Sequence, residues 1–234
     1  DAEAQRFKLD VLRGWPSAVS PLLRGPGLLV AKDGFFRKQD ENGITSFGES
    51  SKAAVSAAIG KFGFGQKAVF HLCDAFIVYA RREDGDAFST VVNPFLEVDV
   101  AGNISRQWEP LDPADIGFLG RKVASDFPDR HLVLWLPLRR EGIQPAPGVG
   151  FSSNIPSAAE TIRELIRPDD LRVVLTALRY LKSIEILENG ESRCALELDV
   201  VQGRFVGPHR LGDGVHAFGG KIEAASERST ASFV

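Results

Sequence analysis

The sequence predicts an α+β fold, a two-layer α/β sandwich in which a mixed, mostly antiparallel sheet carries helices on one face. Strand-like segments come in runs, and helical segments stand alone between them. The regular strand–helix alternation of a doubly wound parallel sheet is absent. The 234 residues, 44% hydrophobic and 25% charged, suit one large domain or one domain plus part of another.

The first elements lead to a candidate site. Apolar and polar residues alternate over 6–12 and predict a half-buried strand. The short apolar segment 28–31 predicts a central strand that places Asp33 at its exit. The polar residues 37–46 predict a short helix. Residues 47–58 are small and weakly periodic, a composition typical of a cover over a site.

The rest of the chain continues the alternation of strand runs with single helices. Val69, Phe70 and Leu72 form the apolar side of a helix predicted over 63–74. Further strands are predicted near 75–82, 87–92, 95–100 and 132–139, with a helix over 113–125 between the last two. Residues 141–156 predict a long loop, followed by helices over 157–167 and 169–182 and a hairpin around Asn189-Gly190. Beyond residue 201 the pattern weakens.

Composition restricts the classes of function. A net charge of −3 does not favour a general nucleic-acid or anionic-membrane surface, so neither partner is expected. Cys73 and Cys194 lie in apolar stretches and indicate core residues in a reducing compartment. The histidines offer no zinc-ligand spacing, and no apolar run approaches the ~20 residues of a membrane-spanning helix. We expect a cytoplasmic protein.

The segment 59–74 is the most informative part of the chain. Gly60, Gly63 and Gly65 precede the predicted helix over 63–74 or lie in its first turn. Glycines let backbone N–H groups approach an anion closely, and a helix N-terminus adds partial positive charge. The pattern therefore indicates a phosphate site, although the same glycines could serve a tight packing corner between a strand and a helix.

Three known glycine-rich nucleotide motifs do not match. A Walker-type loop needs Gly-Lys-Ser/Thr, whereas Gly65 is followed by Gln66-Lys67-Ala68. A dinucleotide fingerprint needs a strand–turn–helix context and a ribose-binding acid at the proper distance, and both are missing. A kinase loop requires later His-Arg-Asp and Asp-Phe-Gly motifs, which the chain lacks.

The order of motifs resembles that of the Bergerat-fold (GHKL) ATPases. A strand ending in Asp33-Gly34 is followed by a small-residue cover with Ser50-Ser51-Lys52 and then by Ile59-Gly-Lys-Phe-Gly-Phe-Gly. Within the superfamily, the segment 25–36 followed by Gly48-Glu-Ser-Ser-Lys looks most like the sacsin ATP-binding domains, which group with heat-shock protein 90. The resemblance covers roughly residues 1–190, so we expect a nucleotide-binding domain there and, over 191–234, a C-terminal extension or the start of a following domain.

The resemblance implies a set of nucleotide contacts. Asp33 would accept a hydrogen bond from the adenine amino group, and the glycines would present N–H groups to the phosphates of ATP or ADP with Mg²⁺. Lys52 and Lys61 would lie near the phosphates as point charges, with residues 47–59 as the lid. The implied nucleotide-binding residues are Asp33, Gly34, Ser51, Lys52, Gly60, Lys61, Phe62, Gly63, Phe64 and Gly65.

The resemblance also implies a function, and the sequence departs from the family pattern at two places. We expect an ATP-driven conformational switch with weak ATPase activity in a chaperone-like multidomain protein that has client or partner proteins. Asp1-Ala2 resembles the end of the motif with the catalytic Glu and Mg²⁺-binding Asn, which would then lie upstream of Asp1. His131-Leu132 stands where the family has Gly-Thr. Both departures favour the alternative, a non-catalytic nucleotide-sensing or protein-interaction module of the same fold.

Overall fold

A computed structural model describes the chain over residues 5–34, 36–45, 69–70, 72–82, 84–93, 96–98, 104–106, 111–129, 131–138, 181–199, 220–224 and 230–233, together with residues 160, 164, 167, 170 and 171. Its strands are β1 (Gln5–Leu12), β2 (Gly27–Lys32), β3 (Phe76–Arg81), β4 (Ala87–Val92), β5 (Leu96–Val98), β6 (Ile104–Arg106), β7 (His131–Pro137), β8 (Leu181–Glu188), β9 (Glu191–Asp199), β10 (Gly220–Ala224) and β11 (Thr230–Phe233). Its helices are α1 (Lys38–Thr45), α2 (Pro113–Ala124) and the 3-10 helix η1 (Pro21–Leu23).

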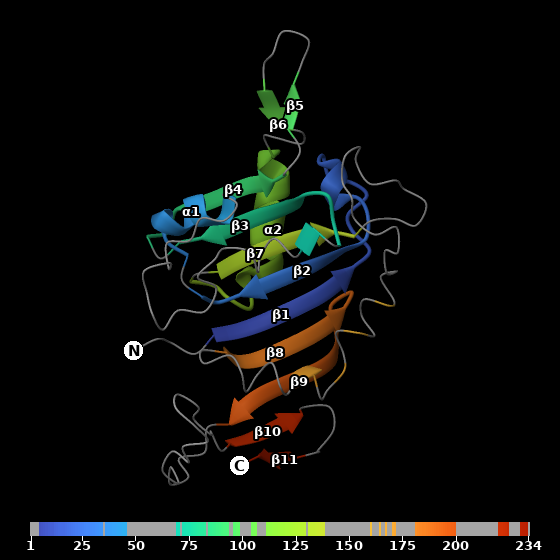
Figure 1. Ribbon diagram of the computed structural model, residues 1–234, viewed down its shortest axis with the longest axis vertical. Coiled ribbons are helices and arrows are strands. Elements are labelled where there is room, and N and C mark those ends of the chain that lie inside the picture. The colour runs from blue at the N-terminus through green and yellow to red at the C-terminus, as the bar shows by residue number, and fades with distance from the viewer. Residues whose placement is uncertain are drawn as a thin grey trace, which may run out of the picture.

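The predicted α+β class is confirmed. Nine strands form one twisted sheet in the order β11-β10-β9-β8-β1-β2-β7-β3-β4, and β5 and β6 form a separate hairpin that projects from one end (Figure 1). The β1–β8 pair is parallel and the other described pairs are antiparallel, so the sheet is mixed and mostly antiparallel, as predicted. β2 lies in the interior of the sheet, which confirms its prediction as a central strand.

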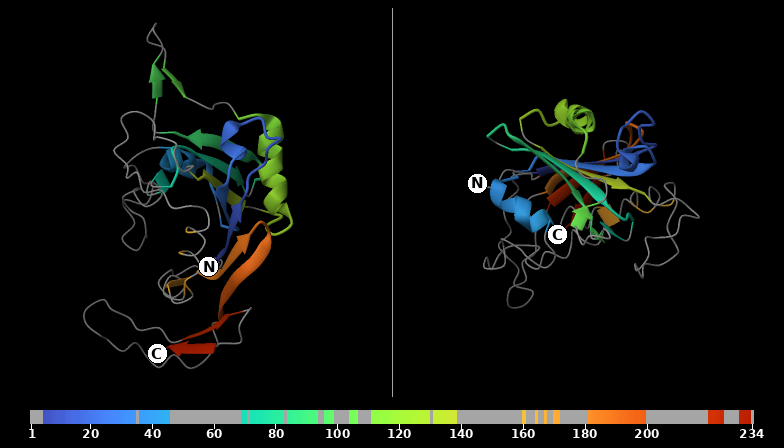
Figure 2. Two further views of the ribbon diagram at one scale, coloured as in Figure 1. Left: turned by 90° about the vertical axis from the view of Figure 1, so that its right-hand side faces the viewer. Right: turned by 90° about the horizontal axis from the view of Figure 1, so that it is seen from above.

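Both faces of the sheet carry a core. Ile77 and Tyr79 of β3 pack into one cluster with α2, whereas Val78 and Ala80 pack into a second cluster with α1. Figure 2 shows α2 on one side of the sheet and α1 on the other. The prediction placed helices on one face. The reason for the difference lies in β3, whose first five residues are all buried, because a strand buried on both sides needs cover on both.

Several element boundaries differ from the prediction. Leu181 and Lys182, expected at the end of a helix over 169–182, begin β8, because Leu181 pairs with Gln5 and is buried among the β8–β9 side chains. A helix was expected over 63–74, but residues 72–74, which the structure describes, are not helical. Val69 and Phe70 there form a 3-10 turn, and the chain then enters β3. β6, β10 and β11 were not predicted.

The hairpin around Asn189-Gly190 is confirmed. Asn189 and Gly190 both have positive φ, 52° and 86°, as a two-residue turn between twisted antiparallel strands requires. β9, β10 and β11 then extend the same sheet, although the domain boundary expected after residue 190 stays a prediction. Cys73 and Cys194 are buried thiols outside any disulfide, as core cysteines should be.

A buried carboxylate holds the loop between β1 and β2 against α2. Asp112 caps this helix by accepting the Ala114 N–H at 2.8 Å, with Pro113 following at the first helical position. One turn on, buried Asp115 accepts the N–H groups of Val19 and Ser20 at 3.1 and 2.7 Å. The loop is thereby tied to the helix that covers the first core cluster.

Candidate functional site

Two of the predicted nucleotide-binding residues, Asp33 and Gly34, lie within the described residues. Both directly follow β2, as predicted; Gly34 is buried, and the Asp33 side chain is 17% exposed. The remaining predicted residues lie outside the described part of the chain: Ser51, Lys52, Gly60, Lys61, Phe62, Gly63, Phe64 and Gly65. The expected lid over 47–59 also lies outside it, so these roles stay predictions.

Arg6 binds the carboxylate of Asp33 at both oxygens. The Arg6 backbone N–H donates to Oδ1 at 2.6 Å, and its Nε donates to Oδ2 at 2.8 Å. The two residues face each other across the β1–β2 pair, where the Asp33 N–H also donates to the Arg6 carbonyl at 3.4 Å. An adenine amino group would have to share this carboxylate with Arg6 through its other lone pairs. Sequence reasoning missed Arg6, because no tight turn sets the register between these strands.

The Arg6–Asp33 pair lies toward the face of the sheet that carries α2. The Arg6 guanidinium lies 5.1 Å from the centre of the Phe127 ring and donates to the Asp126 carbonyl at 3.4 Å. Phe127 belongs to the core cluster under α2. By contrast, Phe70 and Cys73, just after the predicted phosphate segment, pack into the cluster on the opposite face with α1.

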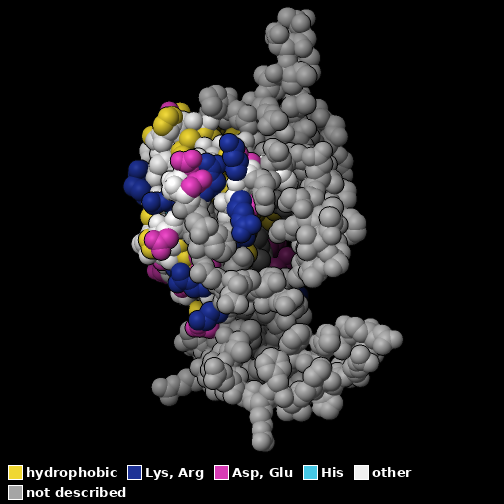
Figure 3. Space-filling view, turned by 90° about the vertical axis from the view of Figure 1, so that its left-hand side faces the viewer, with side chains coloured by type: hydrophobic (Ala, Val, Ile, Leu, Met, Phe, Trp, Pro, Cys, Tyr) yellow, Lys and Arg dark blue, Asp and Glu magenta, His cyan; other side chains and the backbone are white. Residues whose placement is uncertain are grey.

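Arg82 connects the β3–β4 turn to α1. Its guanidinium pairs with Glu41 of α1, with Asp84 at 3.4 Å and with Asp86 at 2.9 Å, and its side chain is largely buried by these contacts. Figure 3 shows basic and acidic side chains interspersed over this end of the molecule. The pairing fixes the helix that immediately precedes the segment predicted as the lid.

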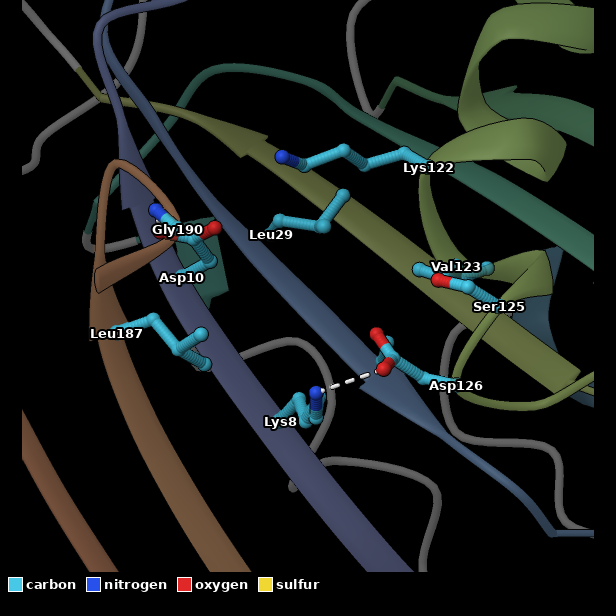
Figure 4. Close-up of a pocket in the computed structure, with 10 residues that line it drawn as sticks. Lys8, Asp10, Leu29, Lys122, Val123, Ser125, Asp126, Leu187 and Gly190 are labelled. Atoms are coloured by element: carbon cyan, nitrogen blue, oxygen red, sulfur yellow. Dashed lines mark hydrogen bonds and ion pairs between the residues drawn. The ribbon is translucent and has the colours of Figure 1, made fainter. Parts of the chain in front are cut away.

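A second group of charged residues lies where the C-terminal end of α2 approaches β1 (Figure 4). Lys8 pairs with Asp126 at 2.9 Å and with Glu185 at 3.2 Å. Burial lowers the pKa of Lys8, but hydrogen bonds to these two carboxylates and their charges outweigh burial and raise that pKa above its usual value. Neighbouring Asp10 is 5% exposed and accepts the Gly190 N–H at 3.1 Å, and burial raises its pKa.

His131 occupies the position where the resemblance expects a small Gly-Thr contact with adenine. The residue is 1% exposed, its ring lies 5.5 Å from that of Tyr79, and its Nδ1 lies 2.8 Å from the Phe127 carbonyl. Nδ1 is therefore the protonated nitrogen, while Nε2 is buried without a hydrogen-bond partner in the described residues. Burial lowers the pKa of His131, so the ring is a neutral core group at neutral pH.

The buried His131 predicts a loss of stability in mild acid. Below the ordinary histidine pKa of about 6.5, the unfolded chain takes up a proton that the native ring resists, so the free energy of unfolding falls by up to about 1.4 kcal/mol per pH unit. Urea unfolding at pH 7.5, 6.5 and 5.5 measures this slope. His131→Phe should be less stable at pH 7.5 but should lose less stability on acidification. Equal slopes for the two proteins would contradict the prediction.

Within the described residues, no group of three or more His, Cys, Asp or Glu side chains could hold a metal ion. None of the helices that the structure describes is long and apolar enough to cross a membrane.

Comparison with known proteins gives a family match and distant structural likenesses, two of which follow. The model of the Sacsin domain matches residues 7–83, which confirms the resemblance to sacsin over that segment. The ATPase and transducer domains of DNA topoisomerase II from Balamuthia mandrillaris match with 11% identity and a TM-score of 0.38, over 84% of this chain and 51% of that one. The ATPase region of Saccharomyces cerevisiae topoisomerase II matches with 12% identity and a TM-score of 0.36, over 83% and 52%.

The chain thus spans about half the length of the solved chains that it matches. With TM-scores below 0.5, these likenesses do not establish a shared topology. A search of curated proteins gave no match.

Proposed function

We propose that this chain is an ATP-binding domain of the sacsin and heat-shock protein 90 type, acting as a nucleotide-driven conformational switch in a chaperone-like protein. The observation that carries the proposal is the Sacsin-domain match over residues 7–83, because this range includes both Asp33 and the glycine-rich segment 60–65. The position of Asp33 supports the proposal, because the residue directly follows an interior strand of the sheet and its carboxylate is partly exposed.

In the proposed complex, two parts of the chain bind two parts of the nucleotide. Asp33 accepts a hydrogen bond from the adenine amino group, and Arg6 holds the carboxylate in one orientation. The N–H groups of Gly60, Gly63 and Gly65 bind the phosphates, with Lys52 and Lys61 nearby as positive charges and Mg²⁺ as the counter-ion. Glu41 and Arg82 hold α1 in place at the start of the lid segment.

Calorimetric titration with ATP and ADP in the presence of Mg²⁺ tests the proposal. We expect the wild-type chain to bind and Asp33→Asn to bind about 10- to 150-fold more weakly, since a hydrogen bond to a charged group contributes about 1.5–3 kcal/mol. Asp129→Asn, a change at an exposed carboxylate on the loop after α2, is the matched control and should bind like the wild type.

Arg6→Gln separates adenine binding from loss of the ion pair. Both Asp33→Asn and Arg6→Gln remove the ion pair and should lower the urea midpoint, but the carboxylate survives in Arg6→Gln, so nucleotide binding should persist there. If wild type and Asp33→Asn bound the nucleotide with equal affinity, Asp33 would not be part of the nucleotide site.

The alternative function is a nucleotide-sensing or protein-interaction module without catalysis. The observation that favours its protein-interaction form is that Arg6 already binds both oxygens of Asp33, which leaves fewer lone pairs for an adenine amino group. A wild-type chain that binds neither nucleotide would support a protein-interaction module.

A further inference from the structure

A cavity of about 270 Å³ lies between the C-terminal end of α2, β1 and β2, and the β8–β9 turn. Small-molecule pockets typically measure about 300–1,000 Å³, so this cavity suits a ligand smaller than a nucleotide. It is separate from the two predicted nucleotide contacts that the structure describes, because neither Asp33 nor Gly34 lines it.

Two opposite charges face this cavity without forming an ion pair in the described part of the chain. The Asp10 carboxylate lies on β1, where the backbone N–H groups of Gly190 and Asn189 donate to it, and its two oxygens have lone pairs for a further donor. Lys122 extends from α2, and its positive charge acts on the Asp10 carboxylate. Figure 4 shows the Lys122 side chain reaching past Leu29 toward the side of the cavity formed by Asp10 and Gly190.

The other charged side chains at the cavity are paired with one another. Lys8 pairs with both Asp126 and Glu185, as described above, at the opposite end of the cavity. Leu29, Ala31 and Leu187 supply apolar lining between the two ends. The charged groups with capacity for a ligand are therefore one carboxylate and one ammonium at one end of the cavity, beside an apolar surface.

We propose that this cavity binds a small zwitterion of the α-amino-acid type, with the ligand carboxylate on Lys122, its ammonium on Asp10 and its apolar side chain against Leu29. A ligand with a single charge would satisfy one of these two groups and leave the other unmatched in a partly desolvated site. Both groups lie on regular elements, Asp10 on an interior strand and Lys122 on a capped helix, so their separation is held by the fold.

Titration of the intact chain with L-leucine, followed by amide chemical shifts, tests the proposal. We expect saturable shifts at the Gly190 and Ser125 amides. Two analogues that each keep one charge, 4-methylpentanoate and 3-methylbutylamine, should bind at least about tenfold more weakly, as expected when a hydrogen bond to a charged group is lost. The proposal would be overturned if leucine caused no shifts at these amides. It would also be overturned if 4-methylpentanoate or 3-methylbutylamine bound there as tightly as leucine.

Variants assign the two charges. Lys122→Gln and Asp10→Asn should each weaken leucine binding at least about tenfold, whereas Arg121→Gln, the exposed neighbour on the same helix, should leave it unchanged. Because Asp10 also holds the Gly190 turn, Asp10→Asn could fail to fold, and Lys122→Gln then decides alone. Unchanged leucine affinity in folded Lys122→Gln would overturn the zwitterion model.

Discussion

Trp135→Ala is expected to lower the free energy of unfolding by about 3–5 kcal/mol, the range for truncating a buried Trp or Phe. Trp135 is 0% exposed, and its ring lies 4.7 Å from that of Trp15 in the loop between β1 and β2. Its Nε1 also donates to the Leu22 carbonyl at 2.7 Å, so the substitution removes both the packing and the bond that hold this loop to β7. The midpoint and slope of urea unfolding measure the loss.

Trp135→Phe separates the two contributions. Phenylalanine keeps most of the buried ring but leaves the Leu22 carbonyl without its donor, which costs about 1–3 kcal/mol. We therefore expect its stability to lie between those of the wild type and Trp135→Ala. If Phe and Ala destabilise equally, the hydrogen bond dominates; if neither destabilises by more than about 1 kcal/mol, this core assignment is wrong.

Gly14→Ala is expected to lower the free energy of unfolding more than the addition of a methyl group at Gly85. Gly14 has φ of +86°, a region that L-residues rarely adopt, and a Cβ there would lie 2.0 Å from the Gly25 carbonyl oxygen. Strained backbone alone costs about 1–3 kcal/mol, and here the clash is with backbone rather than a movable side chain. We expect a loss above that range, or failure to accumulate folded protein, measured by urea unfolding or by soluble yield.

Gly85→Ala is the matched control for this prediction. Gly85 has nearly the same φ, +87°, but an added Cβ would have no atom within 4 Å. It should therefore show the cost of the positive φ alone, about 1 kcal/mol. Similar losses in the two variants would show that the loop beside Gly14 yields to the added methyl group and that the clash contributes little.

The sequence pattern was sufficient for the elements whose hydrophobic residues repeat locally. β1, β2, β3, β4, α2 and the β8–β9 hairpin lie where apolar patterns and turn residues predicted them, and α1 lies where polar composition predicted a short helix. Local conformational preference is enough to place the start of α2 at Asp112 and Pro113 and the hairpin turn at Asn189-Gly190. Such features depend on neighbours within a few residues.

The errors occur where pairing between distant segments decides the conformation. Leu181 continues a leucine stripe at helical spacing, yet it is in a strand because Gln5 pairs with it. The sequences of β10 and β11 show only weak strand patterns. β10 forms because residues Lys221 to Ala224 pair with β9. Tertiary pairing overrides local preference in such segments.

The candidate site divides in the same way. The exit of β2 at Asp33 could be read from an apolar run followed by Asp-Gly, and the structure confirms that position. Arg6 could not be read, because it lies 27 residues away and meets Asp33 only through the β1–β2 register. The cavity at Lys122 and Asp10 likewise joins residues from a helix and a strand far apart in sequence.

The sequence by itself therefore determined the α+β class, the central strand leading to Asp33 and the resemblance to sacsin over residues 7–83. Only the tertiary structure decided that Arg6 holds the Asp33 carboxylate, that α1 and α2 lie on opposite faces, and that Asp10 faces Lys122. The physical reason is that local periodicity specifies which element forms and which of its sides is apolar, whereas strand order and register specify which side chains meet.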